Sequence, residues 1–159
     1  MSTAPGNSSN TATWNEPEVT DNNGAPNVTR TNGLPSGSNF ESGTTHIRYE
    51  ATDSAGNVAT CEFTVNIIDD ESPVFSDCPD SITNNTIPGA VNAIIQWTAP
   101  TPTDNVGLTE VDGGQLYICN YNPGSLFGIG STVVTCTAKD ESNNTGTCEF
   151  NVQIIGMCM

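Results

Sequence analysis

The sequence predicts an all-β chain folded as two tandem β-sandwich domains, and three observations support this prediction. Apolar and polar residues alternate in several short runs, which is the period of a strand with one buried face. No window of helical length has the period of an amphipathic helix. One set of motifs occurs twice in the 159 residues, a length that allows two small domains. Each copy is therefore expected to bury its short strands in a two-sheet sandwich.

The internal repeat is clearest at two tryptophans. Trp14 begins a Trp-x-x-Pro motif followed by Thr-Asp-Asn, and the same motif begins at Trp97, an offset of 83 residues (97 − 14). Further along, Phe40 corresponds to Phe127 at an offset of 87 (127 − 40), so the second copy has 4 extra residues (87 − 83). The insertion falls between Gly107 and Phe127 and is expected in a loop, where added length costs little.

The strands follow from an overlay of the two copies. In the first copy, residues 45–51 and 61–67 alternate on either side of a turn rich in Asp, Ser, Gly and Asn, which predicts a β-hairpin. The second copy repeats this pattern at 134–138 and 148–154. Residues 91–97 alternate as a further strand, and prolines mark the remaining turns and edges.

The chain is strongly acidic, with 18 Asp and Glu against 3 Lys and Arg and a net charge of -15. Such a surface repels phosphate backbones and anionic headgroups, so neither nucleic acid nor a membrane surface is an expected partner. No apolar run approaches the roughly 18 residues of a membrane-spanning helix, so membrane insertion is not expected. Residues 1–10 lack the pattern of a signal peptide, so an export signal is expected to be absent from this sequence.

Cysteines and glycosylation sequons together favour an extracellular, secreted or cell-surface protein. The chain has 6 cysteines, several of them at strand positions, where disulfides would form in an oxidising compartment. Four sequons begin at Asn7, Asn27, Asn84 and Asn143. An Asn- and Thr-rich chain also produces sequons by chance, and the alternative is a cytosolic protein with buried free thiols.

As a set, the repeated motifs resemble the hyalin repeat, or HYR domain. The second copy opens on Cys78-Pro79 and ends on the Cys-Glu-Phe motif at Cys148. The first copy carries the same Cys-Glu-Phe motif at Cys61, preceded by Tyr-Glu-Ala-Thr-Asp-Ser-Ala-Gly-Asn at 49–57. The resemblance covers nearly the whole chain, although the second copy has Ser-Asn-Asn at 142–144 where the family prefers Ala-Gly-Asn.

This resemblance implies a fold and a setting. It implies an immunoglobulin-like sandwich at 1–69 that lacks its opening strand, and a complete sandwich at 70–159. It implies an extracellular protein associated with adhesion and matrix, without catalytic residues.

The two copies also bear on the disulfide pairing. Cys119 and Cys136 correspond to Asn32 and Tyr49 in the first copy, so both cysteines are absent together, as partners should be. This favours a Cys119–Cys136 bridge and leaves Cys78 to pair with Cys148, as the family resemblance also suggests. Cys61 and Cys158 then have no partner in the chain. They are expected to be unpaired, or else to link successive chains.

Candidate catalytic groups are few. His46, the one histidine, alternates in phase with polar residues and is expected to face solvent on a strand. No histidine–cysteine cluster has the spacing of a zinc site. A glycosidase-like carboxylate pair would need a cleft that a small sandwich has little room for. The protein is therefore not expected to be an enzyme.

Acidic residues at the junction of the two copies suggest calcium as a cofactor. Asp69, Asp70 and Glu71 are consecutive there, and Asp104 with Asn105 lies in a turn of the second copy. Carboxylate and amide oxygens are the hard ligands that Ca²⁺ prefers. Further turn carboxylates could contribute: Asp21, Asp53, Asp140 and Glu141. The alternative is that these groups are only solvated turn formers.

The expected function is a structural and adhesive one, in which the domains act as spacers or associate with copies of themselves in a matrix or filament. Partners would be other extracellular proteins or further copies. The alternative is a module that binds a carbohydrate or protein ligand, with Tyr117 and Tyr121 in the inserted loop as stacking faces.

Overall fold

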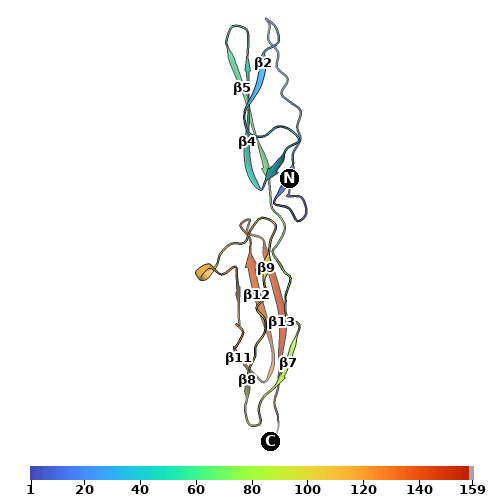
Figure 1. Cartoon of the computed structure of the whole chain (residues 1–159), viewed down its shortest axis with the longest axis vertical. Helices are drawn as coiled ribbons and strands as arrows, with labels where there is room; N and C mark the ends of the chain where they lie inside the picture. The colour runs from blue at the N-terminus through green and yellow to red at the C-terminus, as the bar shows by residue number, and fades with distance from the viewer. Residues whose placement is uncertain (158–159) are drawn as a thin grey trace. The chain divides into compact units, whose positions relative to one another are not determined.

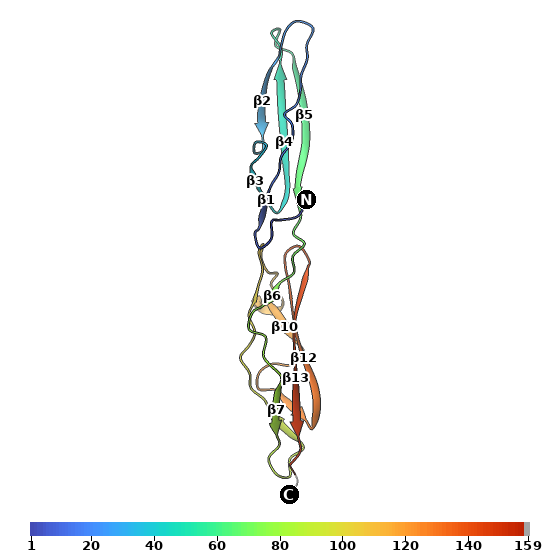
Figure 2. The same ribbon diagram turned by 90° about the vertical axis from the view of Figure 1, so that its right-hand side faces the viewer.

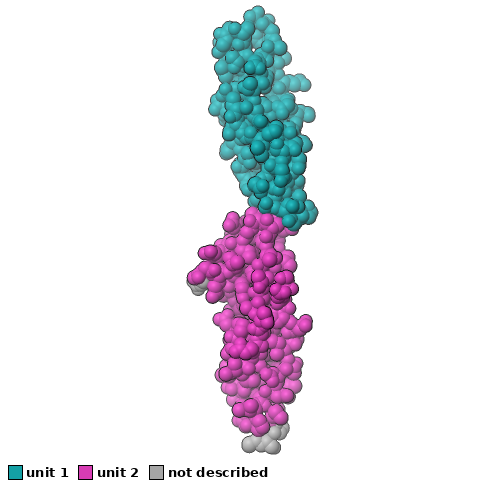
Figure 3. All heavy atoms as spheres, viewed as in Figure 1, with its two compact units in different colours: residues 1–70 teal, residues 71–159 magenta. Residues whose placement is uncertain are grey.

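The computed structural model describes residues 1–157 of the chain, apart from the side chain of Asp112. Its contacts divide the chain into two compact units, unit 1 at Met1–Asp70 and unit 2 at Glu71–Met159 (Figure 3). Cys158 lies outside the described residues. Both units are built from β-strands, which confirms the all-β prediction.

Unit 1 is a small sandwich of two antiparallel sheets (Figure 1). One sheet has the order β2-β4-β5, and the other pairs β1 with β3. The strands of unit 1 are β1 (Ser9–Thr11), β2 (Asn27–Asn32), β3 (Asn39–Glu41), β4 (Gly43–Thr52) and β5 (Val58–Ile67).

The predicted hairpin of unit 1 is confirmed as β4 and β5, which pair from Gly43 opposite Ile67 to Thr52 opposite Val58. On β4 the apolar residues in alternate positions are buried, as the pattern predicts: Ile47, Tyr49 and Ala51. The side chain of Phe40 on β3 packs against the same core from the second sheet.

The first residues of the chain lie beside the end of β5. Ser2 forms a parallel bridge with Ile68, the Thr3 amide donates to the Ile68 carbonyl at 2.9 Å, and the Ile68 amide donates to the Met1 carbonyl at 2.9 Å. Residues 1–3 therefore pair with the segment that follows β5.

Unit 2 has the same plan with one more strand in its main sheet, which has the order β10-β12-β13-β7. Strands β12 and β13 form the second predicted hairpin, and β7 runs parallel to β13 (Figure 2). Facing strands pair as β11-β8 and β6-β9. The described elements of unit 2 are β6 (Val74–Phe75), β7 (Ile82–Asn85), β8 (Asn92–Ile94), β9 (Pro102–Thr103), the 3-10 turn η1 (Asp112–Gly114), β10 (Tyr117–Cys119), β11 (Leu126–Gly128), β12 (Gly130–Lys139) and β13 (Thr145–Ile155).

The strand expected over residues 91–97 is shorter than its alternation suggested. Only Asn92–Ile94 pair with β11, and Val91 is exposed, whereas Ile95 is buried beyond the strand's end. The core of unit 2 forms where the two layers meet, around Phe127, Val134 and Phe150. Of the four alternating apolar residues, Ile95 is buried, Ala93 and Trp97 are half-buried, and Val91 is exposed.

The inserted residues of the second copy lie in a loop, as predicted. Between Gly107 and Tyr117 the chain forms a loop. An antiparallel bridge between Val111 and Gln115, which flank η1, closes this loop. Within residues 1–157, no helix has the length and apolar composition needed to span a membrane.

Candidate functional site

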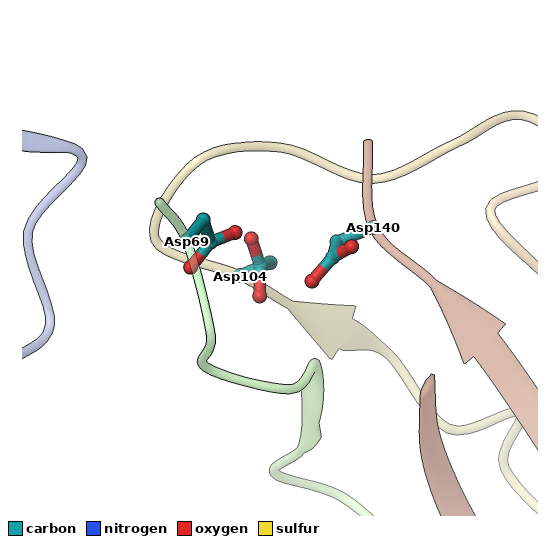
Figure 4. A group of neighbouring side chains, drawn as sticks. All are labelled: Asp69, Asp104 and Asp140. Carbon is teal, nitrogen blue, oxygen red and sulfur yellow. The ribbon is translucent and has the colours of Figure 1, made fainter. Parts of the chain in front are cut away.

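Three aspartates form the one group of potential metal ligands found among the described residues. Asp69, Asp104 and Asp140 each offer a carboxylate oxygen, and these oxygens lie within 4.8 Å of one another. Figure 4 shows the three side chains directed toward a common space. Asp69 precedes β6, Asp104 follows β9 and Asp140 follows β12, so the group joins residues that are far apart in sequence.

Asp140 is held by the turn that connects β12 to β13. It is 1% exposed, and its carboxylate accepts hydrogen bonds of 2.8 Å from both the amide and the side-chain Nδ2 of Asn144. These hydrogen bonds from the turn fix the direction of the carboxylate before any ligand arrives. Asp140 is therefore a preorganised member of the group.

The same turn occurs in unit 1 at Asp53, where the side chain and amide of Asn57 donate to the carboxylate at 2.6 Å and 2.8 Å. These hydrogen bonds, the side-chain one first, hold the pKa of Asp53 below its ordinary value. Both copies thus have the same turn around a carboxylate. Asp140 belongs to the group of three carboxylates, and Asp53 does not.

Asp104 is positioned by the turn that follows β9. Its Oδ1 accepts the amides of Val106 at 2.9 Å and Gly107 at 3.1 Å. Its Oδ2 is buried and has no hydrogen-bond partner among the described residues. A buried carboxylate oxygen without a donor is costly, and a cation would satisfy it.

The structure brings together two of the five residues predicted as calcium ligands, Asp69 and Asp104. Asp70 is exposed and accepts a 2.6 Å hydrogen bond from the Ser2 hydroxyl. Glu71 and Asn105 are half-buried and are not in the three-carboxylate group. Asp140 completes the group. Asp140 is one of the further turn carboxylates named from the sequence, and with Asn144 it repeats Asp53 and Asn57 at the same spacing.

The described cysteines fall into two bridged pairs and one free thiol. Disulfides join Cys78 to Cys148 and Cys119 to Cys136. Cys61 is free and exposed. The second bridge crosses from β10 to β12, and the first ties the segment before β7 to β13.

The predicted glycosylation sites are all on the surface. Asn7, Asn27, Asn84 and Asn143 are exposed, and Asn143 adopts a left-handed backbone with φ of 76°. The hydroxyl of Thr86, in the sequon of Asn84, accepts a 3.1 Å hydrogen bond from the Met157 amide and is buried.

The remaining candidates from the sequence are a histidine and two tyrosines. His46 is exposed on β4, which confirms that it faces solvent. Tyr117 packs edge-on against Phe75 with ring centroids 5.8 Å apart, and Tyr121 packs against Phe127 at 4.9 Å. Both rings of the proposed carbohydrate face are therefore in contact with the protein's own aromatic side chains.

The family model of the HYR domain matches the chain twice, at residues 1–67 and 68–154. The chain belongs to the HYR-domain family. This confirms the resemblance drawn from the motifs and the immunoglobulin-like fold that it implied. The three aspartates of Figure 4 all lie within the second matched segment.

Related proteins are longer than this HYR chain. It is 33% identical over 157 residues to hyalin of Strongylocentrotus purpuratus, covering 96% of the chain and 12% of that protein. It is 35% identical to hyalin of Lytechinus variegatus, covering 94% of the chain and 27% of that protein. It is also 26% identical to the serine-rich adhesin for platelets of Staphylococcus aureus strain MRSA252, over 86% of the chain and 11% of that protein. The chain therefore spans about a quarter or less of each.

Proposed function

We propose that this chain is a non-catalytic, extracellular adhesion module. Membership of the HYR family over both segments is the observation that carries the proposal. Similarity to a protein named as an adhesin supports it, as do two disulfides, which persist in oxidising compartments. The proposed partners are other extracellular proteins and further copies of the chain, assembled into a matrix or filament.

We further propose that the second HYR segment binds calcium through Asp69, Asp104 and Asp140. Three carboxylates whose oxygens lie within 4.8 Å repel one another in a chain of net charge -15, and a divalent cation removes that repulsion. Calcium accepts six to eight oxygen ligands, so backbone carbonyls and water would complete the shell around the three aspartates. An affinity of roughly 10⁻⁴ to 10⁻³ M is typical of extracellular modules.

Calcium titration by calorimetry tests the metal site. The wild type should release or absorb heat at one site and should melt at a higher temperature in saturating calcium. Asp104→Asn and Asp140→Asn should each lose both effects. The control is Asp21→Asn, since Asp21 corresponds to Asp104 in the first copy and is not in the three-carboxylate group. Equal binding by wild type and Asp140→Asn would refute the site.

Bead aggregation tests the adhesive function separately. Beads coated with the chain should cluster with one another, or adhere to a surface of extracellular matrix proteins, in millimolar calcium. Beads coated with the same chain after reduction and alkylation of its disulfides are the control. Aggregation no greater than that control, on every matrix surface tried, would contradict an adhesive function whether or not calcium binds.

A further inference from the structure

An exposed aliphatic pair distinguishes unit 2 from unit 1. The β1-β3 sheet of unit 1 and the β8-β11 sheet of unit 2 each have one pair of facing residues that are both exposed, Thr11 with Asn39 and Ile94 with Leu126. The two pairs correspond, at offsets of 83 (94 − 11) and 87 (126 − 39). Ile94 is 64% exposed and Leu126 is 56% exposed. The second copy therefore presents aliphatic side chains where the first copy presents polar ones.

The exposed pair borders a groove in unit 2. The groove has a volume of about 490 Å³, within the range of small-ligand sites, and is lined by residues of β7, β8 and β11. Figure 1 shows these three strands at the same end of unit 2. Ile87, between β7 and β8, is 75% exposed and adds a third large aliphatic side chain to the lining. An exposed apolar surface of this kind marks a binding site or a liability to aggregation.

One asparagine in the wall of this groove belongs to a glycosylation sequon. Asn84 lines the groove and begins the Asn-Asn-Thr sequence that ends at Thr86. On β7, Asn84 alternates in phase with Ile82, which packs against the core, and with Thr86, which is buried. Asn84 therefore lies on the face of β7 that is directed toward the β8-β11 sheet, although its own side chain is exposed.

The amide group of Asn84 is oriented by its neighbour. Its Oδ1 accepts a 2.8 Å hydrogen bond from the Asn85 amide, which fixes the direction of the side chain. The recorded hydrogen bond thus engages the oxygen and not the Nδ2, the atom to which a sugar is linked. By contrast, the Nδ2 of Asn7, in the first sequon, donates a 3.0 Å hydrogen bond to the Pro5 carbonyl.

We propose that Asn84 carries an N-linked glycan, beginning with an N-acetylhexosamine, whose first sugars lie in this groove and cover Ile94 and Leu126. The proposal rests on the extracellular setting of the proposed function, since exported chains are the ones that receive such glycans. A glycan is bulky and soluble in water, so it replaces an exposed apolar surface with a hydrated one.

The groove suits a sugar ring in its apolar and its polar parts. One face of a pyranose ring presents C–H groups, which would remove part of the Ile87, Ile94 and Leu126 side chains from water. The amide side chains of Asn85 and Asn92, which also line the groove, can pair with sugar hydroxyl and acetamido groups. Because the sugar is tethered at the groove, its effective concentration is high and weak contacts are sufficient.

The covalent step is a transfer from a lipid-linked sugar diphosphate. The Nδ2 of Asn84 forms a bond to the anomeric carbon of the sugar, and the bond from that carbon to the diphosphate oxygen breaks. The diphosphate leaves with the electron pair of the broken bond, and Nδ2 releases one proton. No oxidant or reductant takes part.

Transfer must precede the folding of unit 2. Thr86 supplies the hydroxyl of the sequon and is 2% exposed, and this hydroxyl accepts a 3.1 Å hydrogen bond from the Met157 amide. A transferase that recognises the hydroxyl cannot reach it in the folded unit. The sugar is therefore already in place when the surface formed by Ile94 and Leu126 assembles.

The test uses the full chain, secreted from eukaryotic cells by means of an added signal peptide. Trp14→Phe is included so that Trp97 fluorescence reports on unit 2. Mass spectrometry of glycopeptides should find a sugar on Asn84. Asn84→Gln should lower the melting temperature of unit 2 by about 4 °C or more, because the aliphatic surface loses its cover.

A second background separates contact with the aliphatic pair from a general effect of the glycan. When Ile94→Thr and Leu126→Asn introduce the residue types of unit 1, Asn84→Gln should change the melting temperature by less than about 1 °C. Asn27→Gln removes a sequon of unit 1 and is the matched control, which should leave the melting of unit 2 unchanged. In the glycosylated parent, NMR should detect nuclear Overhauser effects from sugar protons to the methyl groups of Ile94 and Leu126.

An unmodified Asn84 in the secreted chain would overturn the proposal, as would equal losses of melting temperature in the two backgrounds. Absence of the sugar-to-methyl Overhauser effects would also overturn it. Association of glycosylated chains that is abolished by Ile94→Thr with Leu126→Asn would assign the surface to a second copy instead. None of these readouts depends on adhesion or on calcium, and the added signal peptide supplies the compartment, so the proposal and the proposed function can fail separately.

Discussion

The indole Nε1 of Trp14 donates a 3.0 Å hydrogen bond to the hydroxyl of Tyr49, at the place where unit 2 has a disulfide. Tyr49 corresponds to Cys136, which is bonded to Cys119. Trp97, the counterpart of Trp14, has a buried Nε1 with no hydrogen-bond partner among the described residues. At this position unit 1 thus has a hydrogen bond between two aromatic side chains, and unit 2 has a disulfide bond.

Tyr49→Phe should therefore destabilise unit 1 by about 1 to 2 kcal/mol, because it leaves the part-buried Trp14 donor without its acceptor. Urea unfolding followed by Trp14 fluorescence in a Trp97→Phe background measures this effect on unit 1 alone, since the chain has two tryptophans. The control is Tyr117→Phe, followed by Trp97 fluorescence in a Trp14→Phe background. The recorded contact of Tyr117 is the ring packing against Phe75, so loss of its hydroxyl should change the free energy of unfolding by no more than about 0.5 kcal/mol. Equal losses in the two variants would contradict the role given to the Trp14–Tyr49 bond.

The hydrogen bonds at the Asp53 turn predict how the stability of unit 1 depends on pH. The hydrogen bonds from Asn57 lower the pKa of Asp53 in the folded state, so the folded chain holds this proton less tightly than the unfolded chain. The resulting stability is present above the ordinary pKa of about 3.9 and is lost as pH falls through the folded pKa. Asn57→Ala should raise the pKa of Asp53 toward the ordinary value, as measured by NMR titration of the carboxyl carbon. Asn66→Ala, on β5 away from this turn, should leave the titration unchanged.

Much of the fold could be predicted because the chain contains two copies of one pattern. The overlay fixed the phase of Ile47 against Val134 and placed the insertion between Gly107 and Phe127, without any tertiary information. The three-carboxylate group could not be predicted in full, because its members are far apart in the sequence and sequence spacing does not show which of the acidic residues come together. Asp70, next to Asp69, pairs with Ser2 instead, a contact that sequence spacing does not reveal.

The exposure of Cys61 on the core-facing side of β5 could be predicted only in part. The pairing of Ser2 with Ile68 could not be predicted, because residues 1–3 have no strand pattern of their own. Alternation placed Cys61 and Phe63 on the core face, which is correct. It could not show that no part of unit 1 covers Cys61.

The two disulfides should contribute unequally to the stability of unit 2. The Cys78–Cys148 bridge closes a separation of 70 residues and the Cys119–Cys136 bridge one of 17. Chain entropy in the unfolded state gives about 4 kcal/mol for the first and about 3 kcal/mol for the second. Urea unfolding of Cys78→Ala with Cys148→Ala, and of Cys119→Ala with Cys136→Ala, measures both. A non-reducing peptide map of the wild type that linked Cys78 to Cys119 would contradict the pairing itself.

Gly146 on β13 is buried at a point of close backbone approach. A β carbon there would meet the carbonyl group of Pro73, which is itself buried and so cannot withdraw into solvent. Gly128 on β11 offers a contrast. It is also a strand glycine with a negative φ, and a β carbon built on it meets no atom within 4 Å.

Gly146→Ala should therefore destabilise unit 2 by about 1 to 3 kcal/mol, the usual cost of forcing an extra methyl group into a packed site. Gly128→Ala should be neutral or stabilising by up to about 1 kcal/mol, because alanine has less conformational entropy to lose on folding than glycine. Both are measured by urea unfolding with Trp97 as the reporter in a Trp14→Phe background. If segment 73–82 were loosely held, Pro73 would move aside and the two variants would unfold at the same urea concentration. If segment 73–82 is packed firmly, the urea midpoint of unfolding should fall for Gly146→Ala and not for Gly128→Ala.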